Sequence, residues 1–431
     1  MSQQEISDQK GATRAAHLWR DALVAALAGL AAMAVTAALG LWAAGATDLP
    51  GGGFWRVVAA VVVMAVGGSV DISGGAGAIA EARADLSALP LSVTLAGALV
   101  TATCFLRPLR HRAVASTREL AGRAARLAAL WAVALILVSL LARHTFRIPL
   151  GDPTDGLLDD LLDDAAPEVG FRTDIPLTLV FGLLWLAGLL ILALLVSRRA
   201  PLPARLVRFQ EPVRPAAFAV VALLLSYVAL ALVIALVVVV THGHRAETFA
   251  VILLGLPNLA WLALTVGMGA SWEGKVEGPF GLPMPRVLDE VLRTRDISTL
   301  NLGTLTEHDG RAWWLLVAAV VLVPAAAFLM VVRSPARVRP WQHAVHMAVG
   351  LTLTVLMICL VARLSAHYGL SLLGIGDFLD LGSALGGEVL LRPRLWTALG
   401  LAVLWGLLAG LLGSGLAARV HRRGEVEPKA S

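Results

Sequence analysis

Long apolar stretches alternate with short polar loops along almost the whole chain. Ten of these stretches match the ~20 mainly apolar residues that a helix needs to cross a membrane. They are Ala22–Ala44, Phe54–Val70, Leu86–Leu106, Leu127–Leu141, Pro176–Val196, Ala216–Val240, Phe249–Met268, Trp313–Val332, Ala344–Ala362 and Leu395–Leu416. The fourth is short and is expected to begin earlier, near Ala121. The pattern predicts an all-α, polytopic helical membrane protein.

The composition agrees with a chain that lies in lipid. Hydrophobic residues make up 58% of the sequence and charged residues 15%, whereas soluble domains are close to half apolar and a quarter charged. The net charge of +5 is carried by loops beside the apolar stretches, where lipid and topology explain it better than nucleic acid does. The first stretch exceeds the roughly 7–15 apolar residues of a signal peptide, so we expect it to remain as a helix.

The positions of the arginines predict an orientation, because cytoplasmic loops of membrane proteins collect Lys and Arg. Arginines cluster in the segments 107–126, 198–214, 333–339 and 419–423. These four segments, together with the amino terminus, are expected to be cytoplasmic in a cell membrane. The Asp-rich segment 151–174 and the loops at 242–247 and 363–394 are expected on the outside.

This topology does not close with ten simple crossings. A cytoplasmic amino terminus and a cytoplasmic 107–126 segment require an even number of passes between them, yet three stretches precede that segment. The same conflict recurs between residues 214 and 333. Either one stretch of each trio does not cross fully, or a weak pass is hidden in Ser73–Ser87 and in Gly278–Leu292. Irregular backbone is tolerated at membrane depth where protein or water covers it, so we expect re-entrant or broken elements in these two segments.

Similarities between the two halves of the chain indicate a duplication. Arg143 and Trp185 recur 220 residues later as Arg363 and Trp405, in similar apolar contexts. The predicted organisation is a cytoplasmic tail (1–20), two parallel membrane repeats (21–210 and 211–418) and a basic cytoplasmic tail (419–431). The alternative is chance similarity between Leu- and Ala-rich helices. Parallel repeats are common in secondary transporters, although proteins with other functions are also duplicated.

The second and seventh stretches end in small residues that are followed by an acid. Gly67 and Gly68 precede Asp71, and Gly269 precedes Glu273. A glycine lets a helix stop, and a carboxylate beside a broken apolar helix is costly unless it is paired or hydrated. Corresponding breaks in two halves point to a transport site, so Asp71 and Glu273 are candidates to bind a cation, a proton or a cationic substrate. Alternatively, both acids lie at headgroup level and merely end their helices.

Other polar or helix-breaking residues lie in the same parts of the sequence. Arg56 and Asn258 lie in the second and seventh stretches and join the candidate substrate or ion site, although Arg56 can equally extend to the headgroups. Pro257 removes a helix hydrogen bond and either frees a carbonyl for coordination or simply kinks the helix. Pro279 and Pro283 forbid a regular helix in the second weak segment.

The sequence contains no pattern typical of a cofactor or of a familiar catalytic site. It has no glycine-rich phosphate loop and no signature of a serine hydrolase or a zinc protease. His343 and His346 have a spacing that suits a metal, but no third ligand is near them in the sequence. We therefore expect no cofactor, no metal and no catalytic residue, and an unfamiliar intramembrane enzyme stays open as a third function.

Several irregular phrases of the sequence, taken together, point to one family. They are Gly67–Gly74, Leu86–Leu91, Phe105–Arg110, Pro257–Leu259, Gly278–Pro285 and Asp309–Trp314. With these phrases the chain resembles, over nearly its whole length, the streptophobe family of highly hydrophobic multi-pass proteins of actinobacteria. The resemblance implies a cell-membrane location and brings no activity, substrate or catalytic residue with it.

Two main functions follow from these patterns. The first is a permease for a small molecule or an ion, with a site between the two repeats near Asp71 and Glu273. The second is a non-transporting membrane scaffold or sensor that acts through protein partners. The lipid bilayer is the partner that the sequence predicts directly; no nucleic-acid partner is expected, and the oligomeric state does not follow from the sequence.

Overall fold

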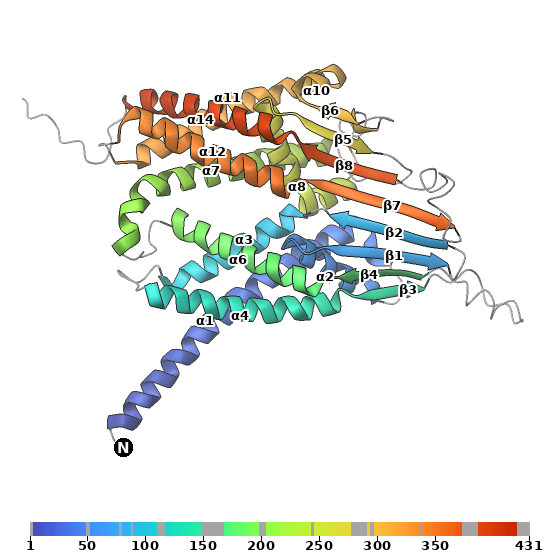
Figure 1. Cartoon of the computed structure of the whole chain (residues 1–431), viewed down its shortest axis with the longest axis horizontal. Helices are drawn as coiled ribbons and strands as arrows, with labels where there is room; N and C mark the ends of the chain where they lie inside the picture. Colours follow the sequence, from blue (N-terminus) through green and yellow to red (C-terminus); the bar gives the residue numbers. More distant parts are fainter. Residues whose placement is uncertain are drawn as a thin grey trace, which may run out of the picture.

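The computed structural model is a helical bundle that carries a β-sheet at one end (Figure 1). It describes residues 3–48, 52–76, 80–87, 89–109, 117–147, 168–197, 204–242, 245–276, 291–293, 297–335, 338–372 and 387–419. Within these ranges, nine helices are long and apolar enough to cross a membrane. They lie in α1 (Gln3–Ala43), α3 (Leu91–Leu106), α4 (Thr117–Leu141), α6 (Ile175–Val196), α7 (Ala204–His242), α8 (Arg245–Gly267), α11 (Trp314–Arg333), α12 (Pro340–Val361) and α14 (Leu395–Ala417). The protein is therefore a multi-pass integral membrane protein of the helical class, as predicted.

Shorter helical elements lie between the long helices and strands along the chain. They are η1 (Ala46–Asp48), α2 (Gly53–Ala65), η3 (Arg107–Leu109), α10 (Leu302–His308) and η4 (Gly310–Trp313). The fourth apolar stretch begins before Leu127, as predicted, because α4 starts at Thr117.

Within the described residues the sheet has eight strands, and it extends from one end of the bundle in Figure 1. They are β1 (Val70–Ala76), β2 (Ala80–Ser87), β3 (His144–Arg147), β4 (Glu168–Thr173), β5 (Trp272–Val276), β6 (Ser298–Leu300), β7 (Leu364–Leu372) and β8 (Gly387–Pro393). Their order across the sheet is β3-β4-β1-β2-β7-β8-β5-β6. All neighbours are antiparallel. Strands from the two halves of the chain therefore share one sheet.

The sheet corrects one expectation from the sequence. Ser73–Ser87 was expected to be a re-entrant or broken element at membrane depth, but it forms most of the β1–β2 hairpin. Its backbone groups pair with neighbouring strands, β4 on one side and β7 on the other, so this segment needs no helix to satisfy them. Most of Gly278–Leu292 lies outside the described residues.

The helix α2 does not cross the bilayer. Its 13 residues span about 20 Å, which is less than the ~30 Å hydrocarbon core. Near its start, Arg56 donates to the backbone carbonyl of Arg143 just after α4. At its end, the Ala65 carbonyl accepts from Thr94 in the first turn of α3. Both ends of α2 therefore lie near the sheet.

The helix α8 is long enough to cross but also runs along the sheet end of the bundle. Gly40, in the last turn of α1, lies against Leu254. Ser92, at the start of α3, donates to the Ile252 carbonyl. Gly267 lies against the Leu315 carbonyl in the first turn of α11. These contacts place α8, like α2, beside the sheet end of the bundle.

Exposed tryptophans mark both ends of the bundle, as expected at the two interfaces of a bilayer. At the sheet end, Trp42 and Trp55 are exposed, and Trp396 is 88% exposed. At the opposite end, Trp19 and Trp341 are exposed. The distance along α1 from Trp19 to Trp42 is roughly 35 Å, which matches the hydrocarbon core with its boundaries. The sheet therefore extends beyond the lipid.

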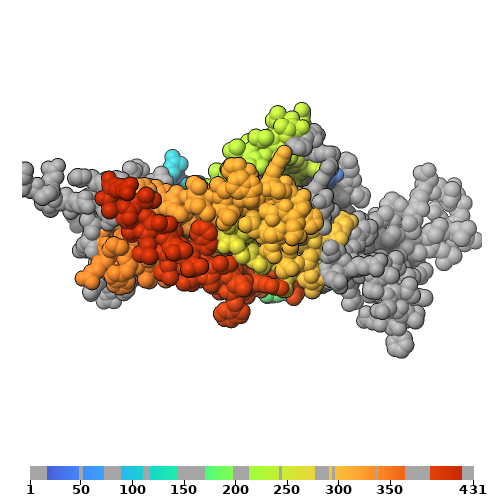
Figure 2. Space-filling view, turned by 90° about the horizontal axis from the view of Figure 1, so that it is seen from above, coloured from blue at the N-terminus to red at the C-terminus, as the bar shows by residue number. Residues whose placement is uncertain are grey.

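Small residues bring the helices of the second half into direct contact, as is common in membranes. Gly406 and Gly410 of α14 lie against the backbone of Ala348 and Ala344 in α12. Gly413 lies against the backbone of α11 in the same way. Figure 2 shows this face of the molecule, where the red surface of α14 runs beside the orange surface of the neighbouring helices.

Candidate functional site

The two candidate acids lie on the sheet rather than inside the bundle. Asp71 is the second residue of β1, is exposed, and is opposite Arg172 of β4. Glu273 is the second residue of β5 and is opposite Arg392 of β8. The carboxylate of Glu273 also accepts a hydrogen bond from Nε of Arg394 at 2.7 Å, and both side chains are about half exposed. Each acid thus has an arginine nearby in its own half of the sheet.

The structure does not bring Asp71 and Glu273 together. The strands β2, β7 and β8 lie between β1 and β5. Four steps of about 4.8 Å place the two strands roughly 19 Å apart. A single cation cannot be held by both carboxylates at that separation, so each acid belongs to a separate surface.

Asn258 connects the two halves instead of facing a substrate. Its Nδ2 donates to the Leu89 carbonyl at 2.9 Å, and its Oδ1 accepts from the Leu91 amide at 3.2 Å. One side chain of α8 thus satisfies two backbone groups at the start of α3. These contacts use the polar groups that the sequence assigned to a substrate or ion.

A serine from the other half binds the backbone of α8 next to Pro257. The Ser92 hydroxyl donates to the Ile252 carbonyl at 2.8 Å and accepts from the Leu256 amide at 3.2 Å. In a regular helix this amide and this carbonyl would bond directly to each other. Pro257 itself lacks the amide that would bond to the Leu253 carbonyl, whereas Ser92 binds the neighbouring Ile252 carbonyl. No pattern in the sequence indicated this role of Ser92.

Arg56, which was expected at the substrate or ion site or at the headgroups, binds the protein backbone. Its Nη1 lies 3.1 Å from the Arg143 carbonyl, while Arg143 donates to the Thr173 carbonyl at 3.2 Å. The two arginines thereby connect α2 and the end of α4 to the base of β4. Among the described interactions, Arg56 has none with Asp71.

The predicted breaks at Gly67 and Gly269 coincide with helix ends of the same geometry. Their φ angles are 92° and 95°, in the left-handed region that favours glycine. In each case the glycine amide bonds to the carbonyl three residues earlier, and the next amide bonds to the carbonyl five residues earlier. This pair of bonds is the usual glycine termination of a helix. A side chain at Gly68 would collide with Val63 and Thr178.

Pro279 and Pro283, the other two predicted helix breaks, lie outside the described residues.

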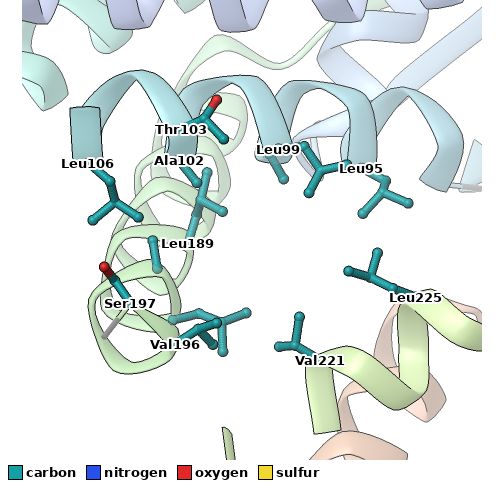
Figure 3. Close-up of a pocket in the computed structure, with 13 residues that line it drawn as sticks. Leu95, Leu99, Ala102, Thr103, Leu106, Leu189, Val196, Ser197, Val221 and Leu225 are labelled. Atoms are coloured by element: carbon teal, nitrogen blue, oxygen red, sulfur yellow. The ribbon is translucent and has the colours of Figure 1, made fainter. Parts of the chain in front are cut away.

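A cavity that the sequence did not reveal lies between α3, α6 and α7 (Figure 3). Its volume is about 500 Å³. Lining residues include Leu95, Leu99 and Ala102 of α3, Leu189 and Ala193 of α6, and Val221 of α7. Thr103 and Ser197 are the polar side chains of the lining, and the Thr103 hydroxyl already donates to the Val100 carbonyl. The cavity suits an apolar group.

The described side chains include no group of three or more His, Cys, Asp or Glu that could hold a metal ion. His343 is buried and His346 half-buried in the first two turns of α12. Comparison of the chain with protein-family models, with curated proteins and with solved structures finds no match. The function must therefore be argued from the chain's own geometry.

Proposed function

We propose that this protein is a non-transporting membrane scaffold that presents a rigid sheet to a protein partner outside the bilayer. The observation that carries the proposal is the ladder between β2 and β7, in which eight residues of one half pair with eight of the other. A scaffold benefits from halves that are fixed relative to each other. A transporter that works by rocking one half against the other does not.

The internal duplication is part of this proposal, and the strand registers support it. The spacing of 220 residues that relates Trp185 to Trp405 also relates β3 to β7 and β4 to β8. His144 is opposite Phe171 in the same way that Leu364 is opposite Leu391. The order β3-β4-β1-β2 then recurs as β7-β8-β5-β6. Each proposed repeat thus contributes four adjacent strands.

The lining of the cavity between α3, α6 and α7 favours the scaffold over the permease. A polar solute or an ion needs a path lined by polar groups or water, whereas the cavity between α3, α6 and α7 is almost entirely apolar. Rocking would also break the two hydrogen bonds of Asn258 and the two of Ser92. Asn258, one of the residues expected to bind a substrate, thus helps to hold the two halves together.

The orientation and location belong to the same proposal. The arginine-rich segments that follow α3, α6, α11 and α14 lie at the ends of helices that start beside the sheet. By the preference of cytoplasmic loops for arginine, the sheet is extracytoplasmic and both termini are cytoplasmic. The proposed location is the cell membrane, which the resemblance to the streptophobe family also implies; membership of that family is itself a proposal.

Spin labels at the cytoplasmic ends test whether the halves move. After Cys104 and Cys359 are replaced by serine, labels at position 107 in one half and 419 in the other are measured by double electron–electron resonance in lipid nanodiscs. A scaffold gives one narrow distance distribution. Two separated distances between the halves, with one distance for a control pair at 107 and 118 within the first half, would contradict the proposal.

A photo-crosslinking amino acid tests the partner surface in cells. Placed at Arg172 or Arg392, both exposed on the sheet, it is expected to give a discrete crosslinked protein. The same amino acid at Leu411, exposed on α14, serves as the lipid-facing control. Crosslinking no stronger on the sheet than at Leu411 would count against a partner there.

A further inference from the structure

The cavity between α3, α6 and α7 lies where the proposed repeats meet. A comparison of corresponding residues in the two repeats explains why the cavity is present in the first half. Helix α3 of the first half corresponds to α11 of the second; Arg107 directly follows α3, and Arg333 is the last residue of α11. Ala102 and Phe328 lie five residues before these arginines and therefore correspond to each other. With the spacing of 220 residues, Ala193 of α6 corresponds to Gly413 of α14. In the second half, a Cβ at Gly413 would lie 2.9 Å from the Phe328 amide, so those two helices touch.

The corresponding residues of the first half face a cavity instead. Ala102 and Ala193 both line the cavity, and neither has a side chain large enough to fill it. Empty space of this size beside lipid is unfavourable, because the lining atoms lose their van der Waals contacts. An apolar group from the surroundings therefore stabilises the gap when it enters.

The depth and length of the cavity match one leaflet of a bilayer. On α3 the lining runs from Leu95 to Leu106, the last residue of that helix. This distance is roughly 17 Å, close to the ~15 Å that one leaflet contributes to the hydrocarbon core. On α6 the lining reaches Ser197, the residue after the helix. The cavity thus extends to the membrane boundary remote from the sheet.

In the sequence, arginine directly follows the lined segment of both α3 and α6. Arg107 is exposed and directly follows Leu106. In the sequence, Arg198 and Arg199 directly follow Ser197. Guanidinium groups bind phosphate oxygens in a bidentate fashion, and anionic lipids are drawn to arginine-rich segments beside membrane helices. Charge at the mouth and an apolar interior together describe the two ends of an anionic phospholipid.

We infer that this cavity binds one acyl chain of an anionic phospholipid from the leaflet remote from the sheet, with its phosphate beside Arg107. The lipid fills the gap between the halves on that side, as direct helix contact does within the second half. The site is independent of the proposed partner surface on the sheet.

Photolabelling of the unmodified protein tests the site directly. The protein is placed in nanodiscs of phosphatidylcholine that contain a small fraction of phosphatidylglycerol with a diazirine on its acyl chain. After irradiation, label is expected in segments 95–106 and 189–197 and is expected to fall when unlabelled phosphatidylglycerol is added. Label spread evenly over lipid-facing helices, or competed equally well by phosphatidylcholine, would overturn the inference.

Cavity-filling variants provide the second measurement. Ala102→Trp or Ala193→Trp is expected to lower labelling of the cavity segments on the order of tenfold, equivalent to about 1.4 kcal/mol. Leu411→Trp, at a lipid-exposed position of α14, is the matched control and should leave labelling unchanged. Equal labelling in all three variants would show that the lipid does not occupy the cavity.

Arg107→Gln separates the headgroup from the acyl chain. We expect it to reduce the preference for phosphatidylglycerol over phosphatidylcholine while label still reaches segment 95–106. A native mass spectrum reports the occupant independently: one retained phosphatidylglycerol per chain supports the inference. A dimer without bound lipid, or a retained free fatty acid in place of phosphatidylglycerol, would contradict the inference.

Discussion

The Ser92 hydroxyl of α3 donates to the Ile252 carbonyl of α8 at 2.8 Å. The same oxygen accepts from the Leu256 amide, so a side chain of the first half completes the helical ladder of the second. Pro257 follows at once and has no amide to offer. The helix that runs across the sheet end of the bundle is therefore completed by the opposite half of the chain.

Removal of this hydroxyl is expected to weaken the contact between the halves. Ser92→Ala leaves the Leu256 amide without this partner and should cost about 1 kcal/mol, within the range of hydrogen bonds between membrane helices. The midpoint of thermal unfolding in detergent, followed by circular dichroism, reports the change. Ser226→Ala is the control, because Ser226 bonds only within its own helix. A Ser226→Ala variant as unstable as Ser92→Ala would show that the effect is not specific to the contact between halves.

Replacement of Gly269, which follows α8 with a positive φ of 95°, should destabilise the protein because of its backbone conformation alone. A Cβ at Gly269 would meet only Leu401 at 3.8 Å, so Gly269→Ala tests the positive φ without a collision. We expect it to destabilise by about 1–2 kcal/mol. Gly400→Ala, within α14 and with nothing within 4 Å of a Cβ, should instead be neutral or stabilise by up to about 1 kcal/mol. Equal unfolding midpoints for the two variants would refute the backbone argument.

Close packing of α12 on α14 should make Gly410 intolerant of size. A Cβ there would lie 2.5 Å from Cα of Ala344, so Gly410→Leu must separate the helices and should cost about 1–3 kcal/mol. Gly415→Leu lies on the same helix with open space around it. We expect size-exclusion chromatography to detect aggregation of the first variant at temperatures where the second is monodisperse. The reverse order would mean that the contact with α12 does not limit stability.

Neutralising the two sheet acids distinguishes the scaffold from the permease. The double variant Asp71→Asn, Glu273→Gln removes an exposed ion pair with Arg394, and such pairs contribute about 0–1 kcal/mol. We therefore expect normal insertion and an unfolding midpoint within a few degrees of the unmodified protein. In vesicles, neither protein should conduct cations above the level of empty vesicles. If the unmodified protein conducted cations and the double variant did not, the result would support the permease instead of the scaffold.

The helices were predictable from the sequence because an uninterrupted run of about 20 apolar residues is a strong indication of a membrane-spanning helix. The sheet was missed for the opposite reason. The β1 strand begins with the β-branched residues Val70 and Ile72 but continues into Ser-Gly-Gly, and β2 alternates Ala with charged residues. Neither strand therefore carries a run of the β-branched or aromatic residues that mark strands. Only the pairing of β2 with β7, from the distant half of the chain, makes this segment a strand in the interior of the sheet.

The candidate site was predictable only where the signal was local. The glycine breaks at Gly67 and Gly269 follow from residue type and coincide with helix ends of the same geometry. The separation of Asp71 from Glu273 depends on strand order, which no local pattern contains. Asn258 stands out in the sequence as a polar residue within an apolar stretch. Its hydrogen-bond partners lie 167 to 169 residues away, so no local pattern predicts them.

The ladder between β2 and β7 also has a consequence for biogenesis. In the proposed orientation, the β2 strand is synthesised and exported long before β7, because α3 to α12 lie between them in the chain. Until the later strands arrive, the growing protein presents an unpaired strand edge on the far side of the membrane, where such edges recruit other chains. Folding of this protein therefore depends on shielding a half-built sheet during translation, by a chaperone or by rapid insertion of the remaining helices.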